Sequence, residues 1–183
     1  MNTNYAAIIY DLDGTLVQLD VDWAQTRQDA INELADHGLT ISTNSLWDVY
    51  TRAAEAELKQ IVEQVITDHE KQGARSAHLL PLAGELPASV PVGVCSLNSE
   101  IACRIALEQT DLSTYIDTVV GRDTVLEQKP SPQPLNKVLE NLEAAPEQAI
   151  FIGDSPRDQE AAKRANIDFE FVSDRISSQD RLS

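Results

Sequence analysis

The chain has 183 residues, 42% of them hydrophobic, which is enough to bury one substantial core with length left for an insertion. Its formal net charge of -16 at pH 7 argues against nucleic acid or an anionic membrane as a partner, because the chain's field repels phosphate polymers. No apolar run approaches the ~18 residues of a membrane span, and residues 1–5 lack the layout of a signal peptide, so we expect a cytoplasmic protein.

Short apolar runs rich in strand-forming residues recur along the chain. The first, at residues 5–10, reads YAAIIY and ends in an acidic turn. Similar runs follow at residues 90–95, 149–152 and 169–172, with a weaker one at residues 116–120. Helical patterns separate these runs, the clearest of them at residues 135–142. Continuous apolar runs are typical of strands covered on both faces, so the alternation predicts an α/β fold with a doubly wound parallel sheet.

Residues 16–78 interrupt this alternation and are expected to be helical throughout. Apolar residues at helical spacing indicate one helix from Trp23 and a longer helix from residue 46 to residue 66. We interpret the segment as a small helical cap inserted after the first strand; the alternative, another pair of helices against the sheet, stays open. The predicted parts are a core of residues 1–15 and 79–175, a cap of residues 16–78 and a polar tail of residues 176–183.

Four residues of types that often carry function are given structural interpretations. Cys95 and Cys103 show neither the spacing of a zinc site nor a disulfide framework, so we interpret them as buried small hydrophobes. Trp23 and Trp47 are interpreted as anchors between cap and core rather than as surfaces on which a substrate stacks.

The many acids and few lysines of the chain resemble the composition of halophilic proteins. An ordinary acidic protein is the competing interpretation.

The sequence DLDGT, which begins at Asp11, directly follows the first predicted strand. Open α/β sheets bind ligands at the carboxyl ends of their strands, and alternation places Asp11 and Asp13 on the same side. Two such carboxylates ~4 Å apart repel by roughly 4 kcal/mol at an effective dielectric of ~20, so they need a cation or a proton. Asp20 and Asp22 have the same spacing but no preceding strand, so we interpret them as a solvated turn or helix cap.

A third acidic group follows the apolar run at residues 149–152, in the sequence GDSPRD. If that strand neighbours the first, Asp154 lies beside Asp11. Oxygen ligands in a partly open site favour Mg²⁺, which keeps several waters and takes a phosphate oxygen of the substrate as a further ligand. Asp158 lies one turn into the following helix, where it either supports the site or only compensates the helix dipole.

Two further residues are candidates for phosphate recognition. Ser96 precedes a helix that Asn98 or Ser99 caps, so its hydroxyl and the free amides there would form a neutral anion site. Lys129 lies in the proline-flanked loop KPSP, which is suited to hold an ammonium group toward the same edge of the sheet. The competing interpretations are an ordinary turn residue for Ser96 and a solvated side chain for Lys129.

The order of these motifs resembles the haloacid dehalogenase (HAD) superfamily: DLDGT, a strand ending in serine, Lys-Pro, and a strand ending in GDSPRD. The resemblance covers most of the chain. It implies a Rossmann-like core with a helical cap after the first motif, in the layout of phosphoglycolate phosphatase-like enzymes. It also implies a Mg²⁺-dependent phosphatase acting on a small phosphate ester. The cap is abbreviated relative to this layout, and either a monomer or a homodimer is consistent with it.

The same resemblance implies the catalytic roles. Asp11 would attack phosphorus and form an aspartyl-phosphate, and Asp13 would protonate the leaving oxygen and then activate water. Gly14 would permit the tight turn after Asp13, and Thr15 would orient that acid through its hydroxyl.

It implies the binding roles as well. The residues that would hold Mg²⁺ are Asp11, the backbone carbonyl of Asp13, and Asp154, with support from Asp158. Ser96 and Lys129 would bind the phosphoryl group being transferred. A family asparagine often follows the serine directly, whereas here Leu97 intervenes, so no role is assigned to Asn98. A phosphomutase would share all these motifs, and a non-catalytic binding or regulatory protein on the same fold is a further alternative.

Overall fold

Five parallel strands form the main sheet of the computed structural model, which describes residues 5–180. Their order across the sheet is β5-β4-β1-β6-β7. The strands are β1 (Ala7–Tyr10), β4 (Val92–Cys95), β5 (Thr118–Val120), β6 (Ala149–Gly153) and β7 (Asp168–Phe171). Each of the five apolar runs contributes one strand, so the predicted α/β fold with a doubly wound parallel sheet is confirmed.

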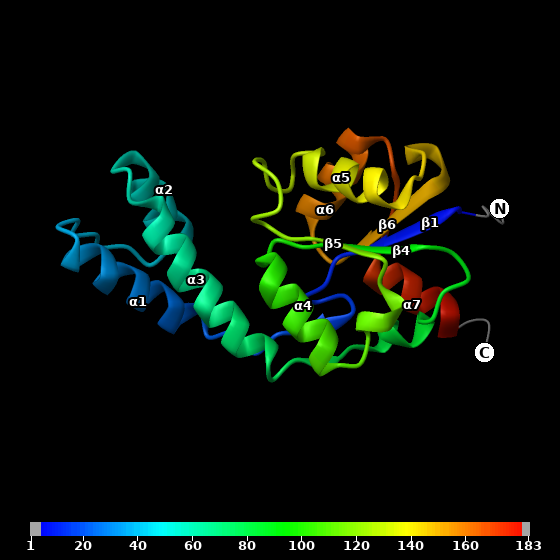
Figure 1. The fold of residues 1–183 in the computed structure, drawn as a ribbon, viewed down its shortest axis with the longest axis horizontal. Helices are drawn as coiled ribbons and strands as arrows, with labels where there is room; N and C mark the ends of the chain where they lie inside the picture. The colour runs from blue at the N-terminus through cyan, green and yellow to red at the C-terminus, as the bar shows by residue number, and fades with distance from the viewer. Residues whose placement is uncertain (1–4, 181–183) are drawn as a thin grey trace.

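Helices cover both faces of the sheet, which explains why its strands are continuously apolar (Figure 1). One face carries α4 (Glu100–Gln109) and α7 (Val172–Asp180), and the other carries α5 (Gln133–Leu142) and α6 (Pro156–Ala165). Successive residues of β1 alternate between the two: Ile9 packs in the cluster with α5 and α6, and Tyr10 in the cluster with α4. Short 3₁₀ turns are η1 (Pro81–Glu85), η2 (Ser113–Tyr115) and η3 (Pro146–Gln148).

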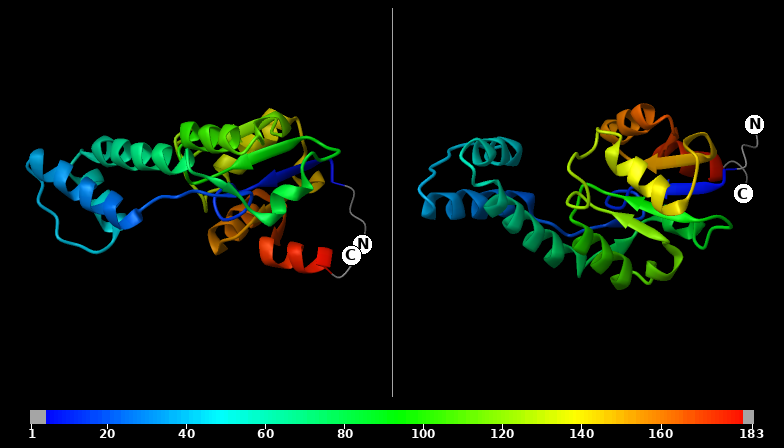
Figure 2. Two further views of the ribbon diagram at one scale, coloured as in Figure 1. Left: turned by 90° about the horizontal axis from the view of Figure 1, so that it is seen from below. Right: turned by 45° about the horizontal axis from the view of Figure 1, so that its top comes forward.

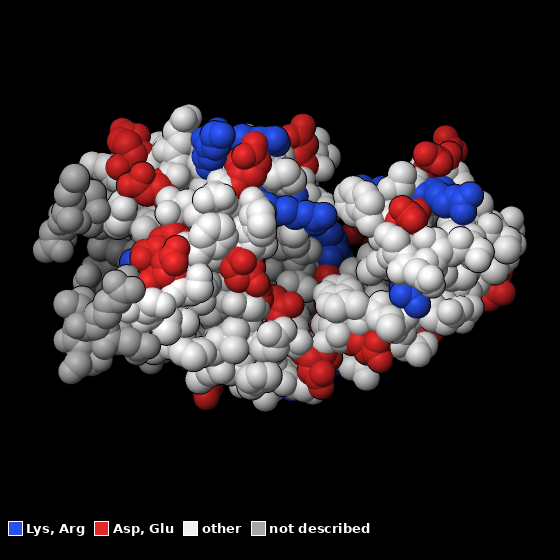
Figure 3. Space-filling model, turned by 180° about the vertical axis from the view of Figure 1, so that it is seen from behind, with Lys and Arg blue, Asp and Glu red and all other residues white. Residues whose placement is uncertain are grey.

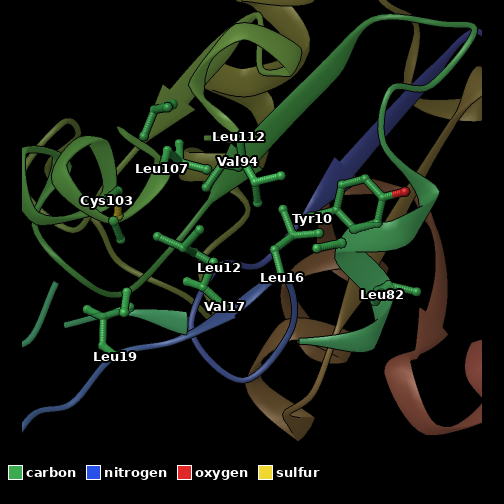
Figure 4. Packing of buried hydrophobic residues seen from close by; sticks show 14 of the residues in the cluster. Tyr10, Leu12, Leu16, Val17, Leu19, Leu82, Val94, Cys103, Leu107 and Leu112 are labelled. Atoms are coloured by element: carbon green, nitrogen blue, oxygen red, sulfur yellow. The ribbon is translucent and has the colours of Figure 1, made fainter. Parts of the chain in front are cut away.

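Buried apolar residues anchor the loop that follows β1. Leu12 and Leu16 are fully buried and share a cluster with Val17, Leu19 and Val94 (Figure 4). The amides of residues 15, 16 and 17 all donate to the carbonyl oxygen of Leu12. Packing and backbone hydrogen bonds therefore fix the path of the loop, so the acidic residues within it have defined positions.

Three helices extend to one side of the core and are called here the helical lobe (Figures 1 and 2). They are α1 (Trp23–Asp36), α2 (Leu46–Glu55) and α3 (Lys59–Ala74). The lobe has its own buried apolar cluster, which includes Leu34, Val49 and Ile66. Two short antiparallel strands, β2 (Val17–Gln18) and β3 (His78–Leu79), pair where the chain leaves and rejoins the core. Within residues 5–180, no helix combines the length and apolar character needed to cross a bilayer.

Two predictions for residues 16–78 are wrong. The segment is not helical throughout, because β2 and β3 form near its ends. The long helix expected from residue 46 to residue 66 is two helices, because the chain turns at Glu57 with φ of 61°, a left-handed conformation that a continuous helix does not contain. The apolar pattern continues across the break because Ala53 of α2 and Val62 of α3 enter the same cluster.

The predicted polar tail is wrong as far as residue 180, because α7 continues to Asp180. Ile176 packs against the apolar cluster on that face of the sheet. Arg175 forms ion pairs with Glu85 at 2.8 Å and with Glu170 at 3.0 Å. Glu85 lies far from Arg175 in the chain, so the polar composition of the segment alone does not indicate the helix. Residues 181–183 of the expected tail lie outside the described residues.

Gly121 directly follows β5 at a position where a side chain has no room. A Cβ atom there would lie 2.2 Å from the backbone nitrogen of Glu100, at the start of α4. We expect Gly121→Ala to lower the free energy of unfolding by about 1–3 kcal/mol, because backbone atoms must move to accept the methyl group. Urea unfolding measures this change. Gly84→Ala is the matched control, since nothing lies within 4 Å of a Cβ at that position. Equal losses in the two variants would contradict the explanation.

Candidate active site

Three central strands end level with one another, and a polar residue follows each. Tyr10, the last residue of β1, is in register with residues of β4 and β6. The amide of Asp11 donates to the carbonyl oxygen of Ile152 at 2.9 Å, which continues the pairing of β1 and β6 by one residue. Because the carboxyl ends of neighbouring parallel strands meet at one edge, Asp11, Ser96 and Asp154 gather there, as the sequence predicts.

Lys129 lies at the centre of this edge and is 5% exposed. Its Nζ donates to Asp11 Oδ1 at 2.9 Å, to the carbonyl oxygen of Cys95 at 3.0 Å and to Asp158 Oδ1 at 2.5 Å. Burial by itself lowers the pKa of Lys129, but attraction to Asp11, Cys95 and Asp158 outweighs burial and raises that pKa. The ammonium therefore stays charged, and the interpretation of Lys129 as a solvated side chain is wrong.

Asp11 is a buried carboxylate with only partial charge compensation. Burial raises its pKa, the Lys129 ammonium lowers it, and the neighbouring Asp158 carboxylate raises it again. The net result is a pKa of about 7. A further cation beside Asp11 would favour the ionised form of the carboxylate, which is the form needed for nucleophilic attack.

Asp13 leaves the same loop but is held differently. Its Oδ1 accepts the amide of Leu19 at 2.8 Å and Nε2 of Gln18 at 3.0 Å. Burial raises the pKa of Asp13, the hydrogen bond from Leu19 lowers it, and the Asp154 carboxylate raises it. The net increase favours the protonated acid, which suits a residue that must donate a proton.

Gly14 and Thr15 complete the loop, with different outcomes for their predicted roles. Gly14 has φ of 81°, so the tight turn predicted after Asp13 is present, and a Cβ there would lie 2.3 Å from Oδ2 of Asp154. Glycine therefore also leaves space for that carboxylate. Among the described residues, Thr15 Oγ1 has no hydrogen-bond partner although it is buried. The prediction that Thr15 orients Asp13 is wrong.

Three carboxylates converge at a position where a cation could bind. Single ligand oxygens from Asp11, Asp154 and Asp158 lie within 4.8 Å of one another. Asp154 is exposed, and its pKa is raised by its partial burial and by the Asp158 carboxylate. Carboxylate oxygens in a partly open site suit Mg²⁺, which binds oxygen and retains waters. The donor set of Asp11, Asp154 and Asp158 thus fits the ion that the sequence implies.

Asp158 contributes to both structure and charge at this edge. Ser155 caps α6 by accepting the amide of Asp158, and Asp158 Oδ2 accepts the amide of Ser155 at 3.1 Å in return. Its other oxygen accepts from Lys129. The helix cap therefore fixes the position of a carboxylate that holds the buried ammonium, so the two interpretations of Asp158 are not exclusive.

Ser96 is buried beside the carboxylates, but the predicted anion site around it is wrong in part. Its Oγ donates to Asn98 Oδ1 at 3.1 Å and accepts the amide of Asn98 at 3.2 Å. The next two amides are also occupied: that of Ser99 donates to Glu70, and that of Glu100 to Asp123. These amides are not free for phosphate, because acidic side chains from other elements reach them first.

A cavity of about 690 Å³ lies between this edge of the sheet and the helical lobe. The predicted site residues that line it are Asp11, Asp13, Ser96, Lys129, Asp154 and Asp158. Figure 3 shows that the surface is hollowed between core and lobe, with basic side chains along the core's edge of the hollow. Trp23 and Trp47 also line the cavity and are 43% and 60% exposed, so both rings are partly open to it.

A buried ion pair joins the lobe to the core, and the sequence-based predictions do not include it. Arg122 Nη1, beyond β5, donates to Glu70 Oε1 of α3 at 2.5 Å, and Arg122 Nε donates to Glu63 Oε2 at 3.3 Å. Glu70 Oε2 also accepts the amide of Ser99 at 2.9 Å. The available signal is that Glu70 stands four residues after the buried Ile66, on the apolar face of its helix.

Known proteins with similar sequences include several phosphatases. A family model described as haloacid dehalogenase-like hydrolase matches residues 8–172. A phosphoglycolate phosphatase of Rhodospirillum rubrum is 29% identical over 184 positions, which cover 88% of this chain and 76% of that one. A phosphoglycolate phosphatase of Aquifex aeolicus is 32% identical over 176 positions, covering 86% and 80%. Pyrophosphatase PpaX of Oceanobacillus iheyensis is 25% identical over 170 positions, covering 87% and 79%.

Solved structures with lower identity share the fold. CbbY from Rhodobacter sphaeroides in complex with phosphate has a TM-score of 0.66 and 20% identity, covering 91% of this chain and 85% of that one. A HAD-superfamily hydrolase of subfamily IA from Geobacter sulfurreducens has a TM-score of 0.62 and 23% identity, covering 90% and 88%. These likenesses concern the Rossmann-like fold alone and extend over the helical lobe as well as the sheet.

Removal of the buried ammonium should unfold the protein more easily. Lys129→Met leaves Asp11 and Asp158 without the cation between them, so we expect the free energy of unfolding to fall by about 3–5 kcal/mol. Urea unfolding at pH 7 measures the loss. Lys137→Met is the control, because that lysine forms a solvent-exposed ion pair with Glu140 and should contribute less than ~1 kcal/mol. A loss for Lys129→Met no larger than for the control would contradict the interpretation that Lys129 is a charged, buried partner of Asp11 and Asp158.

The raised pKa of Asp11 predicts a pH dependence of stability in the presence of a chelator. Between the ordinary carboxyl pKa and a folded-state pKa of about 7, the folded chain binds more protons than the unfolded chain. The contribution of Asp11 to the free energy of unfolding therefore falls as pH rises through this window. We expect the melting temperature of Asp11→Asn to fall less than that of the wild type between pH 5 and pH 7. Parallel curves for the two proteins would show that the Asp11 carboxyl is not perturbed.

Proposed function

Because the chain belongs to the haloacid dehalogenase-like hydrolase family, we propose that it is a Mg²⁺-dependent phosphatase that hydrolyses a small phosphate monoester through an aspartyl-phosphate on Asp11. One observation carries the proposal. A buried carboxylate, Asp11, lies at the edge of a cavity with an ammonium 2.9 Å from one oxygen, a second carboxylic acid two residues on and two more carboxylates nearby.

The first step transfers the phosphoryl group to the enzyme. Lys129 holds Asp11 Oδ1, so we assign the attack on phosphorus to Oδ2. The bond from Oδ2 to phosphorus forms as the bond from phosphorus to the leaving oxygen breaks. Asp13 gives its proton to that oxygen, which departs as an alcohol; the raised pKa of Asp13 supports this role.

The second step releases phosphate and restores the enzyme. Asp13, now ionised, takes a proton from water as the water oxygen bonds to phosphorus and the bond to Asp11 breaks. Lys129 and the Ser96 hydroxyl bind oxygens of the phosphoryl group in both steps. Asp11, Cys95 and Asp158 accept all three N–H groups of Lys129, so the ammonium would exchange one of these hydrogen bonds for one to a phosphoryl oxygen.

The residues that would hold Mg²⁺ are Asp11, Asp154 and the carbonyl of Asp13, with Asp158 in support. When bound, Mg²⁺ supplies positive charge that stabilises the phosphoryl oxygens. The crowding of acids supports this assignment, because Lys129 is the one lysine that hydrogen-bonds to these carboxylates among the described residues.

We assign the helical lobe as the cap, which encloses the substrate and limits the access of water. The cavity between lobe and core supports the assignment, since residues of both parts line it. A phosphomutase would use the same groups but pass the phosphoryl group to a second hydroxyl. Release of inorganic phosphate from para-nitrophenyl phosphate distinguishes the two reactions, because a mutase would pass the phosphoryl group to another hydroxyl instead.

Substitution of the two loop acids should separate their roles. With para-nitrophenyl phosphate and Mg²⁺, we expect Asp13→Asn to lower kcat by about 10²–10⁴-fold, through loss of the base that activates water, and Asp11→Asn to lower it by at least ~10⁴-fold, through loss of the nucleophile. Asp20→Asn is the control, since it removes an exposed acid outside the cavity, and its activity should stay within ~2-fold of wild type. A chelator should abolish wild-type turnover. Asp11→Asn activity close to wild type would contradict the proposal.

A further inference from the structure

We propose that the phosphate ester hydrolysed at this site has a flat, apolar, aromatic leaving group, which stacks on the tryptophan side chains of the helical lobe. The inference rests on the proposed phosphatase function and names its substrate class. It departs from the smallest acids, such as phosphoglycolate, that the names of two relatives suggest.

Both tryptophans of the chain line the same cavity. The sequence contains two, Trp23 and Trp47, and each remains substantially exposed, at 43% and 60%. They come from different helices, Trp23 from the first turn of α1 and Trp47 from the first turn of α2. Large apolar rings left open to solvent at one site mark a surface that gains stability when a ligand covers it.

The aromatic surface is held in position by polar contacts behind it. Trp47 stacks on Tyr50, with ring centroids 5.8 Å apart and an interplanar angle of 11°. The hydroxyl of Tyr50 donates to Glu63, and Arg122 binds Glu63 from the core. The ring of Tyr50 is therefore tied to the sheet through a part-buried network, which limits the rotamer freedom that a ligand would otherwise have to remove.

The charges of the cavity disfavour a second anion on the leaving group. Among the described residues that line it, the lobe contributes no lysine or arginine and one acid, Glu70. On the core side, Lys129 is engaged by Asp11 and Asp158, and Arg122 by Glu70. A carboxylate or second phosphate placed against the lobe would therefore meet apolar rings and an acid, and the remaining cation among the described lining residues, Arg157, already lies over the Trp47 ring.

The remaining cation in the lining also favours an aromatic group. Arg157, within the GDSPRD motif of the core, places its guanidinium 5.8 Å from the centre of the Trp47 ring. The guanidinium already lies over the Trp47 ring, so a planar group would stack on Trp47 by displacing Arg157 or would lie beside the two. The cavity volume of about 690 Å³ has room for a phosphate and a ring.

Four primary alkyl phosphates test the inference at nearly constant leaving-group chemistry. They are 2-phenylethyl phosphate, 2-cyclohexylethyl phosphate, butyl phosphate and 2-phosphoglycolate, assayed by phosphate release with Mg²⁺. We expect kcat/KM for the phenyl ester to exceed that for butyl phosphate by roughly tenfold, and to exceed those for the cyclohexyl ester and phosphoglycolate. The cyclohexyl group is apolar like the phenyl group but not flat, so comparison of the two esters shows whether the preference depends on flatness or on apolar area.

Variants of the lobe show whether the tryptophans cause the preference. Trp47→Ala should reduce the ratio of kcat/KM for phenyl over butyl ester to about 2 or less, and Trp47→Phe should keep most of it, because a flat ring remains. Tyr115→Ala is the matched control, since it truncates a ring that is 41% exposed and outside the cavity. Its ratio should equal that of the wild type. Circular dichroism checks that each variant is folded.

Binding provides a readout that does not depend on turnover. In Asp11→Asn, titration with 2-phenylethyl phosphate should change the tryptophan emission, because both tryptophans line the cavity. Turnover of all four esters without an aromatic preference, or a preference for phosphoglycolate, would overturn the inference while leaving the phosphatase function intact. Absence of turnover on every ester and on para-nitrophenyl phosphate would overturn the proposed function itself.

Discussion

The buried ammonium of Lys129 stabilises the edge of the sheet at which the site residues gather. Lys129 contacts Asp11 after β1, the carbonyl of Cys95 at the end of β4, and Asp158 in α6. Water is largely excluded from around these oxygens. Removal of the ammonium would therefore lower the free energy of unfolding. The ends of neighbouring strands are thus tied by charge as well as by the backbone pairing of the sheet.

This arrangement explains how a strongly acidic chain can bind a phosphate ester. The net charge of -16 repels anions at long range, but Lys129 lies among carboxylates that suit Mg²⁺, and Mg²⁺ bound there would make the local charge favourable to an anion. Burial raises the pKa values of Asp11 and Asp13, and the Lys129 ammonium and the Leu19 amide only partly offset that rise. At this edge, Asp11 is therefore suited to attack phosphorus when a cation is near, and Asp13 is suited to carry a proton.

The sequence predicts the features that depend on local pattern. Five strands and the residues directly after them are recognisable because each apolar run and its polar end are contiguous, as with Asp11 and Asp154. The break at Glu57, the helix containing Arg175 and the ion pair of Arg122 with Glu70 depend on partners far along the chain. The direction of the tryptophans belongs to this second group, because it follows from how the helical lobe lies against the core, which no local pattern determines.

The most direct test of the account is the identity of the residue that becomes phosphorylated. We expect Asp13→Asn to hydrolyse the intermediate slowly, because it lacks the carboxylate that activates water. This variant would be mixed with para-nitrophenyl phosphate and Mg²⁺ and quenched in acid. Treatment with borohydride then reduces an acyl phosphate to an alcohol. Mass spectrometry of the peptides should find homoserine in place of Asp11. Reduction at another residue, or turnover with no modified peptide, would contradict Asp11 as the nucleophile.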